Sequence, residues 1–203
     1  MIHVFEKALA EDVCDILIKK FDDHAKEHTD QEIFDQYELA DDDPMRSGLI
    51  KHVNMLGTKY LDLYDKERMT PKTRAFENFR IKRYDPGKDH SFPWHIDAAN
   101  KESCTRYLAF LFYLNDSEAG TIFKNATVEA IKGNCLCFPP MWMFPHEGVK
   151  PKYKPGSIAD LKDQLQNVEN KLRAEMSWFR DEIAPLKNKQ RQLLHEIEKL
   201  TDG

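Results

Sequence analysis

The spacing of apolar residues divides the chain into three parts. In the first part, apolar residues recur every three or four positions over 9–27 and 45–66, which predicts two helices. The acidic segment 28–43 between them is weakly patterned. It predicts a loop, with at most a short strand at Ile33 and Phe34.

From residue 74 onward, apolar residues recur at every second position, which is the spacing of strands. The first strand series stops at the turn Asp85-Pro86-Gly87, and the run 105–114 is apolar on both faces, as a central strand would be. Further short strands are predicted at 91–97, 121–123, 127–131 and 135–138. Two helices followed by closely spaced strands predict an α+β fold, a sandwich or jelly roll with helices packed on one side.

The third part begins after Pro155-Gly156. Between Ser157 and Leu200 the chain has one proline, Pro185, and no glycine, and its apolar residues again recur every three or four positions. This pattern predicts a long C-terminal coiled-coil-like helix that is kinked or divided at Pro185. We therefore expect two domains, 1–155 and 156–203.

Two arrangements of this tail remain open. A helix with so regular an apolar face cannot bury that face alone, which favours a homo-oligomer formed through 157–200. The alternative is an amphipathic helix that folds back on its own sheet and covers an exposed edge there.

Composition narrows the functional classes. Of the 203 residues 41% are hydrophobic, enough for a core, and the net charge of −5 is not concentrated in either part. Without a basic surface to neutralise phosphates, nucleic acid is not expected as a partner. No apolar run approaches membrane-spanning length, and the first residues lack the build of a signal peptide. We therefore expect a cytoplasmic protein with no membrane partner.

The cysteines fit a reducing compartment, since their spacing suggests no disulfide framework. We expect them to be small buried apolar residues. They are Cys14, Cys104, Cys135 and Cys137.

Candidate metal ligands occur at His95-Ile96-Asp97. In a strand, residues two apart point to the same face, so an imidazole and a carboxylate would project side by side. His146 lies 49 residues beyond Asp97 and would complete the set from another strand. That separation is too long for a local zinc finger. Two histidines and one carboxylate are the usual protein ligands of non-haem Fe(II) sites that keep positions open for oxygen and a co-substrate.

Six short motifs then follow one another between residues 79 and 148. They are Arg83-Tyr84-Asp85-Pro86-Gly87; His95-Ile96-Asp97; Arg106 with Tyr113-Leu114-Asn115; Ala119-Gly120-Thr121-Ile122-Phe123; Lys132-Gly133-Asn134-Cys135-Leu136-Cys137-Phe138-Pro139; and Pro145-His146-Glu147-Gly148. In this order and spacing the segment resembles the catalytic core of the 2-oxoglutarate- and Fe(II)-dependent dioxygenases, in their prolyl 4-hydroxylase-like branch. The resemblance covers about the first three-quarters of the chain. It implies a double-stranded β-helix, and the helices at 9–27 and 45–66 suit the family's helical layer.

The resemblance also implies roles for single residues. His95, Asp97 and His146 would be the iron ligands, with no catalytic residue beyond the metal site. Arg106 would be a substrate-binding residue near the substrate entrance.

Two tyrosines would bind the co-substrate. Tyr84 would contact 2-oxoglutarate near its metal-chelating end, and Tyr113 would help to hold its distal carboxylate. From the residues alone, core packing with a satisfied hydroxyl is the favoured role of both tyrosines, and the resemblance reverses that preference.

The implied cofactor is Fe(II), and the implied co-substrates are 2-oxoglutarate and O2, with ascorbate left open as an additional reductant. In such enzymes, oxidative decarboxylation of 2-oxoglutarate to succinate is coupled to hydroxylation of an unactivated C–H bond. The metal acts as a template, while the protein orients the reactants and keeps the site dry. The partner would be a protein, peptide or small-molecule substrate, and a prolyl residue is one option among these.

The end of the core departs from the family. The family carries a basic residue on its last core strand, nine or ten positions past the distal histidine, which pairs with the distal carboxylate of 2-oxoglutarate. Here Lys152 and Lys154 lie six and eight positions past His146, and Lys154 is the first choice for this role. Pro155-Gly156 follows at once. The final strand is therefore short, supplied differently or missing, which would leave a sheet edge exposed.

Two functions are compatible with these features. The complete set of metal ligands favours a working hydroxylase with an oligomerising tail. The departure at the last strand favours a non-catalytic dioxygenase-like module, assembled through its coil as an interaction or structural protein.

Overall fold

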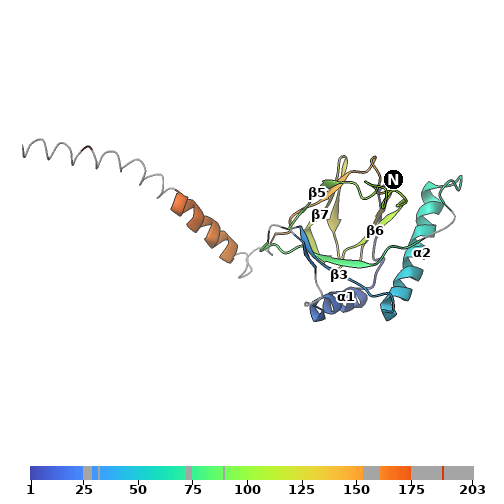
Figure 1. Ribbon diagram of the computed structural model, residues 1–203, viewed down its shortest axis with the longest axis horizontal. Coiled ribbons are helices and arrows are strands. Elements are labelled where there is room, and N and C mark those ends of the chain that lie inside the picture. The colour runs from blue at the N-terminus through green and yellow to red at the C-terminus, as the bar shows by residue number, and fades with distance from the viewer. Residues whose placement is uncertain are drawn as a thin grey trace, which may run out of the picture. The chain divides into compact units, whose positions relative to one another are not determined.

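The structure of the protein is a computed structural model, which describes residues 1–24, 29–31, 33–71, 75–88, 90–152, 161–174 and 189. The chain divides into two compact units, Met1–Lys152 and Tyr153–Gly203. The first unit contains two helices and ten strands among the residues described. Strands surround a common interior, and the helices lie outside it (Figure 1).

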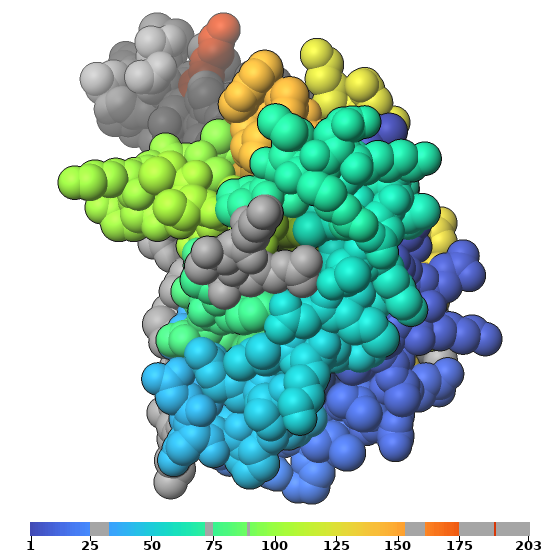
Figure 2. Space-filling view, turned by 90° about the vertical axis from the view of Figure 1, so that its right-hand side faces the viewer, coloured from blue at the N-terminus to red at the C-terminus, as the bar shows by residue number. Residues whose placement is uncertain are grey.

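The two predicted helices are confirmed, with shifted ends. Helix α1 spans Glu11–Asp23 and buries Cys14, Leu17 and Phe21. Helix α2 spans Pro44–Tyr64. It begins sharply because the side chain of Asp43 accepts a hydrogen bond from the Met45 N–H at 2.9 Å, and because proline suits the first helical turn. Figure 2 looks onto the side of the unit that α2 covers.

All strand pairs in the first unit are antiparallel, which confirms the α+β prediction. One sheet has the order β1 (His3–Phe5), β9 (Cys135–Phe138), β6 (Ala109–Phe112). A second has the order β5 (Phe92–His95), β10 (His146–Gly148), β7 (Ser117–Phe123), β8 (Ala126–Ala130). The third has the order β2 (Thr29–Gln31), β3 (Phe34–Glu38), β4 (Arg80–Arg83).

Strand β9 is the centre of the core, and all four of its residues have no exposed surface. Its Leu136 and Phe138 pack against Phe123 and Val128 from the neighbouring sheet. Its Cys137 packs on the other side, where the cluster includes Tyr60 and Leu61 of α2. Because both faces are covered, this strand is apolar throughout.

The prediction that 105–114 is a central strand is wrong. Only Ala109–Phe112 is a strand, and it lies at the end of its described sheet, beside β9. The run is apolar on both faces for another reason. Leu111 packs toward Phe123 and Phe138, whereas Phe110 packs with the α2 cluster.

Two other expectations need correction. The segment 28–43 contains β2 and β3 rather than a loop, and β3 pairs with β4 to form the sheet under α1. Cys104 is exposed, whereas Cys14, Cys135 and Cys137 are buried as expected, and all four are free thiols.

In the second unit the structure describes a helix at 161–174 and the single residue 189. No coiled coil is shown. The rest of the predicted long helix lies outside the described residues, as does the predicted boundary at 155 and 156, which stays a prediction. None of the described helices has the length and apolar character that crossing a bilayer would require.

A buried ion cluster ties β3 to β4 and to the turn that follows β4. Asp35 is 3% exposed and accepts hydrogen bonds from Arg83 Nη2 and Lys88 Nζ, both at 2.9 Å. Burial alone would raise the pKa of Asp35, but the two hydrogen bonds and positive charges outweigh it and lower the pKa to about 2. The charged carboxylate therefore stabilises the folded state.

We expect Asp35→Asn to lower the free energy of unfolding at pH 7 by about 2–3 kcal/mol, the equivalent of a shift of about two pKa units. Because the folded pKa is depressed, this stability is present above pH ~4 and is lost as the pH falls toward 2. Urea unfolding across this range should show the wild-type and variant curves converging in acid. Asp23→Asn, at an exposed pair with Lys19, is the control and should change little. A constant difference between wild type and Asp35→Asn at all pH values would contradict the assignment.

Candidate metal centre

Two histidines meet at the pairing of β5 with β10. In that antiparallel pair His146 lies directly opposite His95, and the two ring centroids are 4.2 Å apart. Asp97 is not on the same strand as His95, contrary to the prediction of a strand over 91–97. Strand β5 ends at His95, and the chain turns at Asp97 so that its carboxylate approaches both rings.

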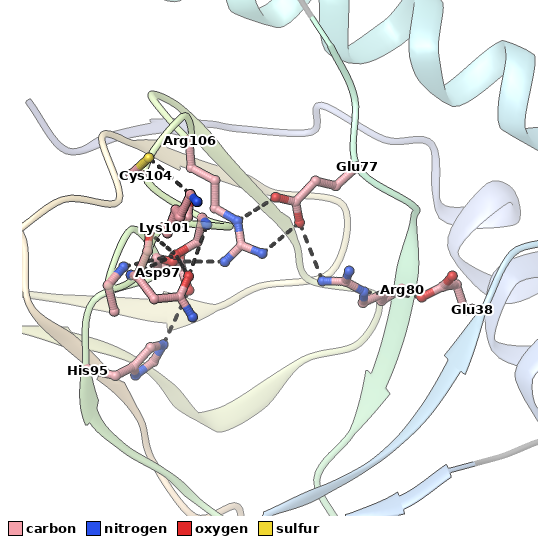
Figure 3. Close-up of polar contacts among 11 residues, drawn as sticks. Glu38, Glu77, Arg80, His95, Asp97, Lys101, Cys104 and Arg106 are labelled. Carbon is pink, nitrogen blue, oxygen red and sulfur yellow. Dashed lines mark hydrogen bonds and ion pairs between the residues drawn. The ribbon is translucent and has the colours of Figure 1, made fainter.

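The three side chains converge on one point. Each offers one ligand atom, and these atoms all lie within 4.8 Å of one another. Asp97 Oδ1 is 3.5 Å from His95 Nε2, and Asp97 Oδ2 is 3.9 Å from His146 Nε2. Figure 3 shows the carboxylate of Asp97 directed toward His95.

The other nitrogen of each imidazole is held by the backbone. His95 Nδ1 lies 2.8 Å from the Pro93 carbonyl oxygen, and His146 Nδ1 lies 3.1 Å from that of Phe144. A carbonyl oxygen only accepts hydrogen bonds, so each Nδ1 carries a proton and donates it, while each Nε2 is directed at the carboxylate of Asp97. This second contact is the one that orients histidine ligands in metal sites.

The segment after Asp97 is fixed from three directions. The Asp97 carbonyl oxygen accepts a hydrogen bond from Arg106 Nη1 at 2.8 Å, and the next N–H, of Ala98, donates to the Pro140 carbonyl at 3.0 Å. Ser103, which is buried, closes the following turn through hydrogen bonds with Asn100. The carboxylate is therefore positioned before any ligand arrives.

The protonation states of the cluster favour a cation. Burial alone would raise the pKa of Asp97, but the hydrogen bond with His95 and the nearby positive charges lower it, so the carboxylate is ionised. Burial lowers the pKa of His146, so its ring is neutral. Metal ligation requires an anionic carboxylate and neutral imidazoles.

Apolar rings shield the histidines from solvent. Phe92 stacks on His95 with ring centroids 3.7 Å apart, and Phe138 meets the edge of His146 at 4.7 Å. His146 is 4% exposed, and Asp97 is the ligand most open to solvent, with 26% of its side chain exposed. One side of the cluster is thus dry and another is open to an incoming molecule.

These observations test whether the residues fit the implied metal. Two imidazoles and one carboxylate, with no further His, Cys, Asp or Glu grouped with them among the described residues, form the donor set of non-haem Fe(II) sites. Both rings already have the outer contact that such ligands need. The residues fit Fe(II).

Both tyrosines assigned to the co-substrate are partly buried. The hydroxyl of Tyr84 lies 3.8 Å from the place where a Cβ on Gly148 would stand, beside β10, and burial raises its pKa to about 12. Tyr113 shares a hydrogen bond of 2.9 Å with Thr121 Oγ1, and its ring packs in the core cluster of β9. For Tyr113 the core role is therefore visible, and the co-substrate roles stay predictions.

The two remaining residues with predicted roles are Lys154 and Arg106, and the structure describes only the second. Lys154 lies outside the described residues. Arg106 makes a two-pronged ion pair with Glu77, with Nη2 at 2.8 Å from Oε2, in addition to its bond to the Asp97 carbonyl (Figure 3). Glu77 in turn contacts Arg80 on β4 at 3.5 Å. This links Arg106 to the positioning of Asp97, and its role toward substrate stays a prediction.

Lys82 is a further residue near the site that was not predicted from the sequence. This residue lies on β4, two positions before Tyr84, and its ammonium stands 4.2 Å from the ring centre of Phe34 and 4.9 Å from that of Phe92. Its position could have been inferred from Tyr84, which was already assigned to the site. Residues two apart in an extended segment point to the same face, so Lys82 and Tyr84 are expected on the same side.

Comparison with known proteins shows where this fold occurs. The sequence matches no protein family and no curated protein. Among solved structures, it is similar to the viral collagen prolyl hydroxylase of Paramecium Bursaria Chlorella virus-1 in complex with 2OG, with a TM-score of 0.57, 18% identity, and coverage of 74% of this chain and 88% of that chain. It is also similar to a Pseudomonas putida prolyl-4-hydroxylase, with a TM-score of 0.54, 15% identity, and coverage of 74% and 85%.

These likenesses confirm the resemblance at the level of the fold. The antiparallel sheets with their two helices match the jelly roll of the prolyl hydroxylases, within the 2-oxoglutarate- and Fe(II)-dependent dioxygenases. At 15–18% identity the comparison extends to the fold alone. Function has to be argued from the residues of the site.

Proposed function

We propose that the protein is a non-haem Fe(II)- and 2-oxoglutarate-dependent dioxygenase that hydroxylates an unactivated C–H bond. The observation that carries the proposal is the convergence of His95, Asp97 and His146 within 4.8 Å, with both Nδ1 atoms held by backbone carbonyls. The fold shared with prolyl hydroxylases adds support.

In this proposal His95 Nε2, Asp97 and His146 Nε2 would hold the iron. When bound, the metal would supply the activation of oxygen that couples decarboxylation of 2-oxoglutarate to hydroxylation. The protein contributes the orientation of its three ligands, which leave the remaining coordination positions free. Phe92 and Phe138 exclude water from the histidine side, which strengthens the electrostatic contacts there.

A peptidyl proline is the first substrate to test, because the similar solved structures are prolyl hydroxylases. Another side chain and a small molecule remain as alternatives. Tyr84 would contact the chelating end of 2-oxoglutarate, and Arg106 would lie at the substrate entrance. Ascorbate belongs in the assay as an additional reductant.

The decisive experiment is an anaerobic titration of the full chain with Fe(II) and then 2-oxoglutarate. Formation of the keto-acid chelate should produce a visible charge-transfer band that saturates at one equivalent of iron. A protein that binds neither iron nor 2-oxoglutarate would contradict the proposal.

The second candidate is a non-catalytic dioxygenase-like module that acts in assembly. It is favoured by the end of the sheet, since no strand follows β10 among the described residues of this unit. The same titration separates the two candidates, because only the enzyme requires the ternary complex of protein, iron and 2-oxoglutarate.

For the tail we propose a homo-oligomer formed through 157–200. In the described helix 161–174 the apolar residues are spaced by four, three and four, and each is more than half exposed. They are Leu161, Leu165, Val168 and Leu172. A stripe with this spacing is the seam of a coiled coil.

We expect the full chain to be a dimer or trimer by light scattering. The double variant Leu165→Glu, Leu172→Glu should be a monomer, because charges in the seam are desolvated on association. Gln164→Glu, Lys171→Glu changes the same helix outside the seam and is the control. A full chain that stays monomeric at high concentration, and loses stability when 157–203 are deleted, would favour the folded-back helix instead.

A further inference from the structure

A lysine on β4 lies near the candidate metal centre, over a ring that also contacts His95. On β4, Ile81 packs with Phe21, Tyr37 and Leu39, so it points toward the helices. Lys82 is the next residue and therefore points to the other face of the strand, into the interior between the sheets. There its ammonium lies over Phe92, the same ring that stacks on His95.

The ammonium of Lys82 is reached by solvent and also lies beside the candidate metal centre. The residue is exposed, although its ammonium stands over two aromatic rings, those of Phe34 and Phe92. Because Phe92 also stacks on His95, a single ring separates the charge of Lys82 from a candidate metal ligand.

The ammonium lacks a counter-ion among the described residues. Its contacts there are the faces of Phe34 and Phe92, whereas Arg80 and Arg83 on the same strand are paired with carboxylates. Cation–π contacts contribute less than an ion pair in a partly buried position, so an incoming carboxylate would find an unmatched charge.

The charge balance of the proposed complex calls for such a partner. Fe(II) with one carboxylate and two neutral imidazoles carries a net charge of about +1, and Lys82 raises it to about +2. 2-Oxoglutarate carries two negative charges, so the occupied site would be neutral. Without Lys82 the complex would leave a partly buried negative charge unpaired, which is costly.

We propose that Lys82 on β4 pairs with the distal carboxylate of 2-oxoglutarate, in place of a basic residue on a last core strand. This inference rests on the proposed function, since it assumes that the keto-acid end is held at His95, Asp97 and His146. It assigns the specificity for a dicarboxylate to β4 rather than to a strand that follows β10. Lys154 is the competing anchor.

The test compares two keto acids on the same iron-loaded full chain under anaerobic conditions. 2-Oxopentanoate has the chelating end of 2-oxoglutarate and a methyl group where the distal carboxylate would be. The charge-transfer band of each chelate gives its dissociation constant without any turnover. We expect the wild-type protein to bind 2-oxoglutarate about 100-fold more tightly than 2-oxopentanoate, as for a partly buried charge pair.

Lys82→Met keeps the apolar stem that packs on the two phenylalanines and removes the charge. It should weaken 2-oxoglutarate binding about 100-fold and leave 2-oxopentanoate binding within about twofold of wild type. Lys82→Arg should retain most of the preference. Lys19→Met, at an exposed ion pair on α1, is the surface control. Unchanged unfolding of Lys82→Met would show that the fold is intact.

The outcomes separate this inference from the proposed function. If the wild-type chain binds no iron, the proposed function fails and the inference fails with it. If iron binds and both keto acids bind equally, or if Lys82→Met keeps the preference while Lys154→Met loses it, the role of Lys82 is overturned and the metal site stands.

Discussion

We expect His146→Ala to abolish Fe(II) binding, and Asp97→Ala and His95→Ala to do the same. Each substitution removes one of the three candidate ligands found among the residues that the structure describes. Loss of an outer contact to a metal ligand already costs about 10–100-fold in affinity, so loss of the ligand itself should exceed about 100-fold. Calorimetric titration of the metal-free protein with Fe(II) under anaerobic conditions measures this directly.

Thermal unfolding gives a second measure of the same loss. A metal present at 100 times its dissociation constant stabilises the folded state by about 2.7 kcal/mol. For a protein of this size that corresponds to a rise in Tm of about 5–10 °C. The rise should appear in the wild-type protein and vanish in the three variants.

The control must be a histidine outside the cluster. His3 on β1 contacts Tyr64 through its ring nitrogen, at 3.0 Å, and belongs to another sheet. His3→Gln should therefore bind Fe(II) as the wild type does. If His95→Ala and Asp97→Ala still bound metal with the wild-type affinity, the cluster would not be the metal centre.

The candidate metal cluster could be predicted because two of its residues are close in the sequence and because two histidines with one carboxylate are a characteristic ligand set. His95 and Asp97 are two residues apart, and the motif around His146 has a recognisable order in the chain. The reason given for their proximity was partly wrong. Asp97 reaches the histidines from a turn held by Arg106 and Ala98, not from the face of a strand. Spacing identified the ligands, while tertiary contacts place them.

Short strands that pair with segments distant in the sequence were not predicted. Strand β1 has three residues, and its register places His3 opposite Cys137. Strand β10 also has three residues, between β5 and β7. Three residues are too few to show a period of two, so their pairing partners determine them. Strand β3 is longer, with five residues, but its buried positions do not alternate, since Phe34, Asp35 and Tyr37 are all buried.

Lys82 was missed for a different reason. The strand series before the Asp85-Pro86-Gly87 turn was interpreted from its apolar and aromatic residues, Phe76, Phe79, Ile81 and Tyr84. Of these, Phe79 and Ile81 mark the face that packs under the helices. The opposite face is charged and therefore looks like a solvent-exposed face in the sequence. The ammonium of Lys82 nevertheless lies over Phe92, the ring that stacks on His95, and this contact depends on distant strands coming together rather than on the alternation within β4.

The Ala119-Gly120-Thr121 motif has a steric basis that the sequence does not reveal. At Gly120 a Cβ atom would lie 2.0 Å from the Val128 carbonyl oxygen and 3.2 Å from Glu129 Cα, both of them backbone atoms of β8. The register of β7 against β8 shifts between Ser117 and Gly120, so the strands approach closely at this irregularity. Only glycine fits there without moving one strand.

We therefore expect Gly120→Ala to lower the free energy of unfolding by about 3 kcal/mol, the upper end of the usual cost of overpacking, because the clash is with backbone. Its effect should reach the metal centre. The Gly120 carbonyl accepts a hydrogen bond from the Val149 N–H at 3.2 Å, and β7 pairs directly with β10, which begins at His146. A displaced β7 would shift that histidine, so Fe(II) affinity should fall together with stability.

Gly48 provides the matched control. It lies inside α2, and a Cβ atom there would meet nothing within 4 Å. Gly48→Ala should therefore raise the free energy of unfolding by about 0.5–1 kcal/mol, because alanine restricts the unfolded chain and favours the helix. Urea unfolding of the metal-free proteins measures both changes, with opposite signs expected for the same substitution. If the free energy of unfolding of Gly120→Ala were within about 0.5 kcal/mol of the wild-type value, the substitution would be as neutral as a typical surface change. That result would show that β8 can move to accommodate the Cβ atom and that the register shift does not depend on glycine.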